Sequence, residues 1–158
     1  MADGVGGGAE GKQTSAGIAR RIEESYYLDK LGEGEFFDPA QALIRALRET
    51  NQEYAGWNAD KASDVRTYST CTCIAILSGI AYVVWVGDSP AFLLRQGEII
   101  AQTQASEWRE GERTGPYTIG DPRSDEQIRI AEWPLAGEDI LLMSSDGLVR
   151  VVSPEEIE

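Results

Sequence analysis

The sequence contains no histidine among its 158 residues. This absence excludes Ser-His-Asp and Cys-His catalysis, a histidine general base and histidine-ligated zinc. Basic residues are also scarce, since 14 Lys and Arg stand against 27 Asp and Glu, for a formal net charge of −13. Such an acidic surface repels phosphate backbones and anionic lipids, so we expect neither nucleic acid nor a membrane as a partner. Any chemistry must therefore use carboxylates, hydroxyls, backbone groups or a hard metal ion.

Cysteine is nearly absent as well, with only Cys71 and Cys73. On a strand the two side chains would share one face at a spacing poorly suited to a disulfide, and two thiols are too few for a closed zinc site. We interpret them as core thiols of a reducing compartment. The apolar stretch 71–87 is short for a bilayer span, and the first residues do not resemble a signal peptide. We therefore expect a cytoplasmic protein.

Two segments of the first 60 residues have the spacing of amphipathic helices. Residues 14–31 carry apolar side chains at i, i+4 and i+8 and are followed by glycines, which predicts a helix that ends there. Asp38 and Pro39 match the N-cap and first position of a second helix, which we expect to end at Gly56. The polar stretch 58–67 is expected to be a loop.

The apolar period then changes from 3.6 to 2, which indicates strands. Ser78-Gly79 and Gln96-Gly97 are two-residue hairpin signals. The stretch 104–126 has no period and is expected to be a loop, and Ser153 is expected to begin a further helix. The expected strands are 70–77, 80–86, 91–95, 98–102, 127–131 and 139–144. Helices followed by antiparallel strands predict an α+β domain in layers, with the central strands covered on both faces.

Three aspartates stand beside glycine at corners of the chain: Asp3 before Gly4, Asp88 after Gly87, and Asp146 before Gly147. Asp88 and Asp146 each follow an apolar strand, so they emerge where a buried strand ends. Carboxylates that converge in this way suit Mg²⁺ or Mn²⁺, which prefer oxygen ligands. The alternative is that all three are ordinary turn dipeptides.

A glycine-rich segment offers a nucleotide-binding alternative. Residues 6–12 read G-x-x-x-x-G-K, which is close to a phosphate-binding loop. Two features weaken this reading: Gln13 stands where the magnesium-binding Ser or Thr is required, and only residues 1–5 precede the loop, where a strand is needed to aim it.

Three segments, in order, resemble the metal-dependent protein serine/threonine phosphatases of the PPM, or type 2C, family. They are ADGVGG, STCTCIAILSGIAYVVWVGDSPAFLLRQGEI and LAGEDILLMSSDGLVRVVSPEEI. The resemblance implies one domain over residues 1–158, a sandwich of two antiparallel β-sheets flanked by helices. We expect this domain to be partial, since the family's first strand with its phosphate-binding arginine, and its final Asp-Asn segment, have no counterpart in the sequence. A shortened sandwich would expose strand edges.

The same resemblance implies roles for four residues. Asp3 would bridge two Mg²⁺ or Mn²⁺ ions, Gly4 would offer its carbonyl to one of them, and Asp146 would bind the other. Asp88, together with Asp146, matches the place of a third ion in some members. A metal-activated water would hydrolyse phosphoserine or phosphothreonine in a phosphorylated protein substrate.

Several positions depart from the family pattern. Pro90 stands where an arginine is usual, Tyr68 where a glycine is usual, and Arg150 where an acid is frequent. Together with the missing ends, these departures leave open a phosphatase-like module that binds phosphorylated or regulatory partners without turnover.

Overall fold

The computed structural model describes residues 1–5 and 9–157. The chain forms, in order, β1 (Ala2–Val5), α1 (Ala9–Glu33), η1 (Gly34–Phe36), α2 (Pro39–Ala59), η2 (Ser63–Val65), β2 (Tyr68–Leu77), β3 (Ile80–Val86), β4 (Ala91–Arg95), β5 (Glu98–Gln102), β6 (Glu107–Glu110), β7 (Arg113–Pro116), η3 (Pro122–Gln127), β8 (Arg129–Pro134), β9 (Ile140–Met143), α3 (Asp146–Val149) and α4 (Pro154–Ile157). No helix in these described ranges combines the length and apolarity that crossing a membrane requires.

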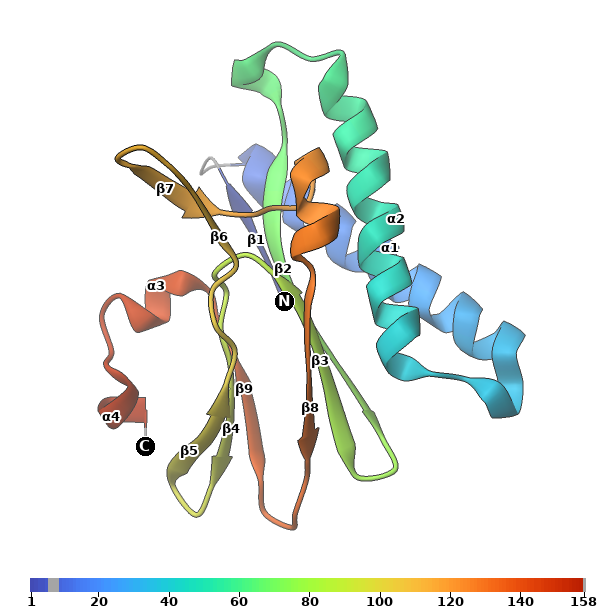
Figure 1. Cartoon of the computed structure of the whole chain (residues 1–158), viewed down its shortest axis with the longest axis vertical. Coiled ribbons are helices and arrows are strands. Elements are labelled where there is room, and N and C mark those ends of the chain that lie inside the picture. The colour runs from blue at the N-terminus through green and yellow to red at the C-terminus, as the bar shows by residue number, and fades with distance from the viewer. Residues whose placement is uncertain (6–8, 158) are drawn as a thin grey trace.

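The strands form two antiparallel sheets and a separate hairpin. The first sheet has the order β1-β2-β3-β8, the second has the order β5-β4-β9, and β6 pairs with β7. Figure 1 shows α1 and α2 against one side of the first sheet and the second sheet on its other side. The expected α+β fold with two antiparallel sheets is confirmed.

Both long helices extend farther than their patterns predict. α1 begins at Ala9 rather than at residue 14, and it passes through Gly32 before Gly34, at φ +56°, ends it. Asp38 caps α2 as expected, because its carboxylate accepts hydrogen bonds from the backbone N–H groups of the second and third helical residues at 2.9 and 3.1 Å. Gly56 does not end α2. A glycine within a helix costs only about 1 kcal/mol, and buried Asn58 holds the last turn in place.

The two hairpin predictions are confirmed. Ser78 and Gly79 have φ values of +53° and +77°, and Gln96 and Gly97 have +56° and +88°, as a type I′ turn requires. These turns set the register of β2 with β3 and of β4 with β5.

The loop expected at 104–126 was wrong in part. This stretch contains the β6–β7 hairpin, which turns at Gly111 with φ +62°, and the 3₁₀ helix η3. Its strands have four residues each and are largely exposed, so they carry no alternating apolar pattern that a sequence could reveal. The strand expected at 127–131 lies two to three residues later, as β8.

The hydrophobic core has two layers on either side of the first sheet. Along β3, Val84 and Val86 face the helices, whereas Val83 and Trp85 face the second sheet. The helix-side cluster consists of Ile18, Ile22, Leu43, Ala46, Leu47, Tyr54, Cys71, Ala75, Val84, Val86 and Ile119. The sheet-side cluster consists of Ala81, Val83, Trp85, Ala91, Leu93 and Trp133. The central strands are therefore covered on both faces, as expected.

Buried Asn51 fastens α2 to the segment before η3. Its amide donates to the Asp121 carbonyl at 3.1 Å and to Asp125 Oδ1 at 2.7 Å, and its carbonyl accepts from the Gly120 N–H at 2.8 Å. Replacement by alanine would leave the buried Gly120 N–H unpaired, at a cost of about 1–3 kcal/mol. It would also remove the hydrogen bonds to Asp125 and to the Asp121 carbonyl, each worth about 1 kcal/mol, although the Asp121 carbonyl keeps the Ser124 N–H as a donor.

We therefore expect Asn51→Ala to lower the free energy of unfolding by roughly 2–4 kcal/mol, as measured by urea denaturation. Gln52→Ala is the matched control, because Gln52 is exposed and donates to the same Asp125 carboxylate at 3.1 Å. Equal stability of the two variants would contradict a tethering role for Asn51.

An ion pair lies at one end of the second sheet. This is the end farther from the connections that follow β3 and β9. Arg95 donates two hydrogen bonds of 2.8 Å to the two carboxylate oxygens of Asp139, whose side chain is only 3% exposed. The Ala136 N–H donates to the same carboxylate at 2.7 Å. The hydrogen bonds from Arg95 have the largest effect and the bond from Ala136 the next largest, and together they lower the pKa of Asp139 from 3.8 to about 2.

The stability that Asp139 contributes should depend on pH in a defined direction. Since its folded pKa lies below its unfolded value, the contribution is complete above about pH 4 and is lost as pH falls toward 2. We expect urea midpoints of the wild type and Asp139→Asn to differ most at neutral pH and to converge between pH 4 and 2. Glu132→Gln, an exposed carboxylate on β8, should show no such convergence.

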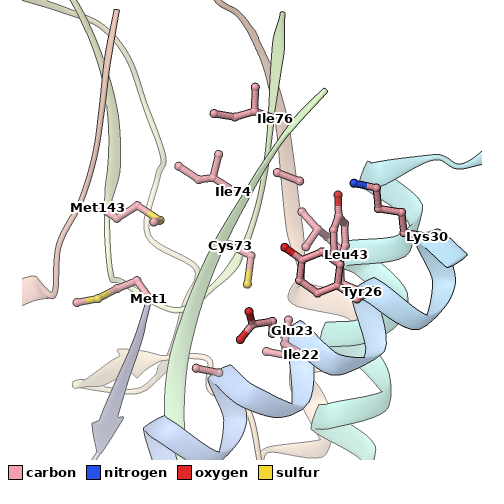
Figure 2. Close-up of a pocket in the computed structure, with 13 residues that line it drawn as sticks. Met1, Ile22, Glu23, Tyr26, Lys30, Leu43, Cys73, Ile74, Ile76 and Met143 are labelled. Carbon is pink, nitrogen blue, oxygen red and sulfur yellow. The ribbon is translucent and has the colours of Figure 1, made fainter. Parts of the chain in front are cut away.

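The edge of β2 is only partly covered. β1 pairs with residues 68–71, Met1 bonds to Thr72, and among the described residues no strand pairs with this edge of β2 over residues 73–77. A pocket of about 380 Å³ lies at this edge. Figure 2 shows its lining residues between α1 and Met143. Cys71 and Cys73 are free cysteines with sulfur atoms 3.6 Å apart, and Cys71 is buried.

Candidate metal centre

A pocket of about 370 Å³ lies at the other end of the first sheet, where β1, the connection after β3 and the connection after β9 meet. All four residues predicted from sequence border it. Its lining consists of Asp3, Gly4, Thr70, Asp88, Pro116, Asp146 and Arg150. Aspartates that are far apart in the sequence are thus brought to one place by the two sheets.

β1 sets the position of Asp3 and Gly4. In the antiparallel register of β1 with β2, Asp3 lies opposite Thr70 and Gly4 opposite Ser69. The Ser69 hydroxyl also donates to the Asp3 carbonyl at 2.9 Å. The first predicted corner is therefore an edge strand held in register, not a free turn.

Asp88 is positioned by hydroxyl groups of β2. Its neighbour Ser89 is buried, with its hydroxyl 2.6 Å from that of Thr70, and the Ser89 carbonyl accepts from the Thr72 hydroxyl at 2.7 Å. Gly87 has φ +102°, and a side chain there would collide with Thr70. We did not predict these supporting residues from the sequence. The signal that could have found them is the pair Thr70 and Thr72 at alternate positions of an otherwise apolar strand.

Asp146 follows β9 and begins α3. β9 pairs with β4, with Met143 opposite Ala91, and the Ser144 N–H donates to the Pro90 carbonyl at 3.1 Å. The connection after β9 is thereby fixed to the one that carries Asp88. Pro90, a departure from the family pattern, takes part in this link through its backbone.

The electrostatics of the pocket are dominated by its carboxylates. Burial raises the pKa of Asp88, and the nearby charge of Asp146 raises it further. Asp146 itself forms an ion pair of 2.5 Å with Arg150, one turn later in the chain. The pocket thus combines mutually repelling carboxylates with a single neighbouring guanidinium.

The donor chemistry of the pocket fits a hard divalent cation, since it offers carboxylate and carbonyl oxygens. A cation would also relieve the repulsion that raises the pKa of Asp88. The oxygens are not assembled in advance: within residues 1–5 and 9–157, no three Asp, Glu, Cys or His side chains form a cluster that could hold a metal ion. Asp146 is turned toward Arg150 instead.

The nucleotide-binding alternative falls partly outside the described residues, which omit residues 6–8. Residues 9–12 lie in α1, and residues 2–5 form a strand, so the expected absence of a preceding strand was wrong. This strand is antiparallel to β2, however, whereas the nucleotide-binding loop follows a strand of a parallel βαβ unit.

Comparison with known proteins identifies relatives over nearly the whole chain. The family described as protein phosphatase 2C matches residues 1–157. Protein phosphatase 1F of Rattus norvegicus is 29% identical over 148 residues, covering 76% of this chain and 32% of the relative. Protein phosphatase 1E of Mus musculus is 29% identical over 147 residues, covering 75% of this chain and 19% of the relative. The chain therefore spans about a third or less of the length of these curated relatives.

Solved structures share the fold. The serine/threonine phosphatase of S. agalactiae matches with a TM-score of 0.78 at 19% identity, over 98% of this chain and 69% of that chain. The catalytic domain of the serine/threonine protein phosphatase PstP, in complex with two manganese ions, matches with a TM-score of 0.73 at 23% identity, over 98% and 69%. The order of the motifs, the layered sheets and the family match over residues 1–157 agree, and the chain belongs to the protein phosphatase 2C family.

Proposed function

We propose that this chain is a metal-dependent protein phosphatase domain that hydrolyses phosphoserine and phosphothreonine in protein substrates. The observation that carries this proposal is that Asp3, Asp88 and Asp146, from three separate corners, border one pocket in a member of the protein phosphatase 2C family. The relatives' names, and the structural neighbour with two manganese ions, support the same activity.

In this proposal Asp3, the Gly4 carbonyl and Asp146 would hold two Mg²⁺ or Mn²⁺ ions, and Asp88 with Asp146 would hold a third. Such ions lower the pKa of a water molecule and neutralise charge on the phosphoryl oxygens. The chain's own contribution is to fix the ligands. The Ser69 hydroxyl holds the backbone of Asp3, and the hydroxyls of Thr70 and Thr72 hold the connection that carries Asp88.

The test is hydrolysis of a phosphothreonine peptide by the purified chain during titration with Mn²⁺. We expect phosphate release that requires Mn²⁺, stops on addition of a chelator and returns when Mn²⁺ is restored. Asp3→Asn keeps the size of the side chain, removes its charge and should abolish the release. A folded chain that binds Mn²⁺ but releases no phosphate would contradict the proposed catalysis.

A second candidate is a phosphatase-like module that binds phosphorylated partners without turnover. The ion pair between Asp146 and Arg150 favours it, because that carboxylate is already engaged, as does the lack of a preassembled ligand cluster among the described residues. The same experiment separates the candidates: the module would bind the phosphopeptide, in an equilibrium binding measurement, at Mn²⁺ concentrations that produce no hydrolysis.

A further inference from the structure

Arg150 occupies an unusual place in the pocket. Of the described residues that border the pocket, it is the only basic one, among three aspartates. Its guanidinium lies 2.5 Å from Asp146 Oδ2, at i+4 spacing. The Arg150 side chain is 72% exposed and that of Asp146 27%. An exposed cation therefore borders the pocket, in contact with a carboxylate that a metal ion would use in the proposed function.

We propose that Arg150 is an exchangeable counter-ion: it neutralises Asp146 while no metal ion is bound, and it binds the phosphoryl group once a metal ion has taken Asp146. This inference deepens the proposed function and rests on it. It assigns the phosphate-binding guanidinium of the pocket to the C-cap residue of α3, which follows Asp146 by about one turn.

The first half of the exchange follows from the weakness of an exposed ion pair. Such a pair at i+4 contributes little where it meets water, because holding the side chains in one geometry costs them freedom. Here the Arg150 side chain is well solvated and Asp146 is partly exposed. A divalent cation that binds several carboxylates at once displaces a single guanidinium readily. Arg150 therefore competes with the metal without blocking it, so its removal should tighten metal binding.

The second half follows from the charge of the ligand. A phosphate monoester is an anion, and a pocket bordered by three aspartates repels it unless cations compensate. The planar guanidinium of arginine presents paired N–H donors that match phosphate oxygens. Because its side chain is long and exposed, Arg150 can turn from Asp146 to a ligand at the rim without a change in the backbone of α3.

The chain contains a matched pair outside the pocket. Arg20 and Glu24 on α1 also form an ion pair at i+4 spacing, with 2.8 Å between nitrogen and oxygen, and both side chains are at least half exposed. Neither residue borders the candidate metal centre. Arg20→Ala therefore removes the same net charge and the same kind of pair without touching the pocket.

The first measurement is Mn²⁺ affinity, followed by the electron paramagnetic resonance signal of free Mn²⁺. We expect Arg150→Ala to bind Mn²⁺ three- to tenfold more tightly than the wild type, and Arg20→Ala to bind it as the wild type does. Equal or weaker binding by Arg150→Ala would overturn the counter-ion role.

The second measurement is affinity for inorganic phosphate at saturating Mn²⁺, by calorimetry. Arg150→Ala should weaken phosphate binding at least tenfold, and Arg150→Lys, which keeps the charge but not the paired donors, should fall between. Unchanged phosphate affinity in Arg150→Ala would overturn the phosphate-binding role.

The two measurements separate this inference from the proposed function. If the wild type binds Mn²⁺ but does not hydrolyse the peptide, the proposed catalysis is wrong. The affinities of Arg150→Ala for Mn²⁺ and for phosphate can still be measured in that case, so the inference remains testable. Mn²⁺ binding by Arg150→Ala alone would mean that Arg150 blocks the metal ion, which overturns the proposed exchange and contradicts a working site in the wild type. Absence of Mn²⁺ binding in both proteins overturns both proposals.

Discussion

Asp146→Ala is expected to lower Mn²⁺-dependent hydrolysis of a phosphothreonine peptide by about a thousandfold or more. Asp146 lies where α3 begins, beside Asp88 in the pocket, and in the proposed function it holds more than one ion. A metal ion contributes several kcal/mol of transition-state stabilisation, and each 1.36 kcal/mol corresponds to about a tenfold change in rate. Loss of a shared ligand should therefore have a large effect on the rate.

The measurement compares initial rates of phosphate release at saturating Mn²⁺ for the wild type and the variant. Asp64→Ala is the control, because Asp64 is an exposed aspartate in the first turn of the short helix η2 and does not border the pocket. Mn²⁺ affinity measured in parallel gives a readout that needs no turnover. A variant that retains the wild-type rate and affinity would exclude Asp146 as a ligand, and with it the proposed site.

The positions of the three aspartates could be predicted because each belongs to a local pattern. Asp88 and Asp146 follow apolar strands, and β3 in particular, at residues 80–86, has the bounds that its β-branched run predicts. The end of a buried strand must emerge at an edge of its sheet, so a polar residue there is visible in sequence. Convergence of the carboxylates on a divalent cation was inferred from these strand-end positions, and the family resemblance then implied a role for each residue.

The supporting network could not be predicted, because it depends on register between distant segments. Thr70 contacts Ser89 only because β2 pairs with β3 up to Val86, and the connection then returns across the end of β2. In sequence, the alternate positions of Thr70 and Thr72 mark one polar face of the strand, but they do not reveal which groups their hydroxyls contact. Likewise, asparagine is a residue type expected on the exposed face of a helix. Only the folded chain shows that Asn51 and Asn58 are buried against the segment before η3.

Arg150 is a residue that the sequence singles out but whose contacts only the structure shows. The sequence marks it as a departure from the family pattern, which by itself favours loss of activity. The structure adds that its guanidinium pairs with Asp146 and borders the pocket. In the proposed function, a departure that places a cation beside the candidate metal centre can serve the chemistry, so the Arg150 variants test a functional role and not only a loss of activity.

Gly4→Ala is expected to produce a large loss of stability. In β1, a Cβ atom on Gly4 would lie 2.2 Å from the carbonyl oxygen of Gly11 and 2.6 Å from its carbonyl carbon, in α1. These are backbone atoms, so no side-chain rotation can relieve the collision, and either β1 or α1 must move. Overpacking typically costs 1–3 kcal/mol and occasionally more, and for a contact with rigid backbone we expect about 3 kcal/mol or more.

Gly11→Ala, on the other side of the same contact, is the matched control for this prediction. A Cβ on Gly11 would lie 3.4 Å from the Gly4 carbonyl oxygen, close to an ordinary contact, and alanine favours a helix over glycine by up to about 1 kcal/mol. Thermal unfolding in the presence of a chelator separates packing from metal binding. There Gly4→Ala should lower the midpoint by about 6–12 °C, while Gly11→Ala should leave it unchanged or raise it. Equal midpoints for the two variants would mean that β1 and α1 do not approach each other this closely.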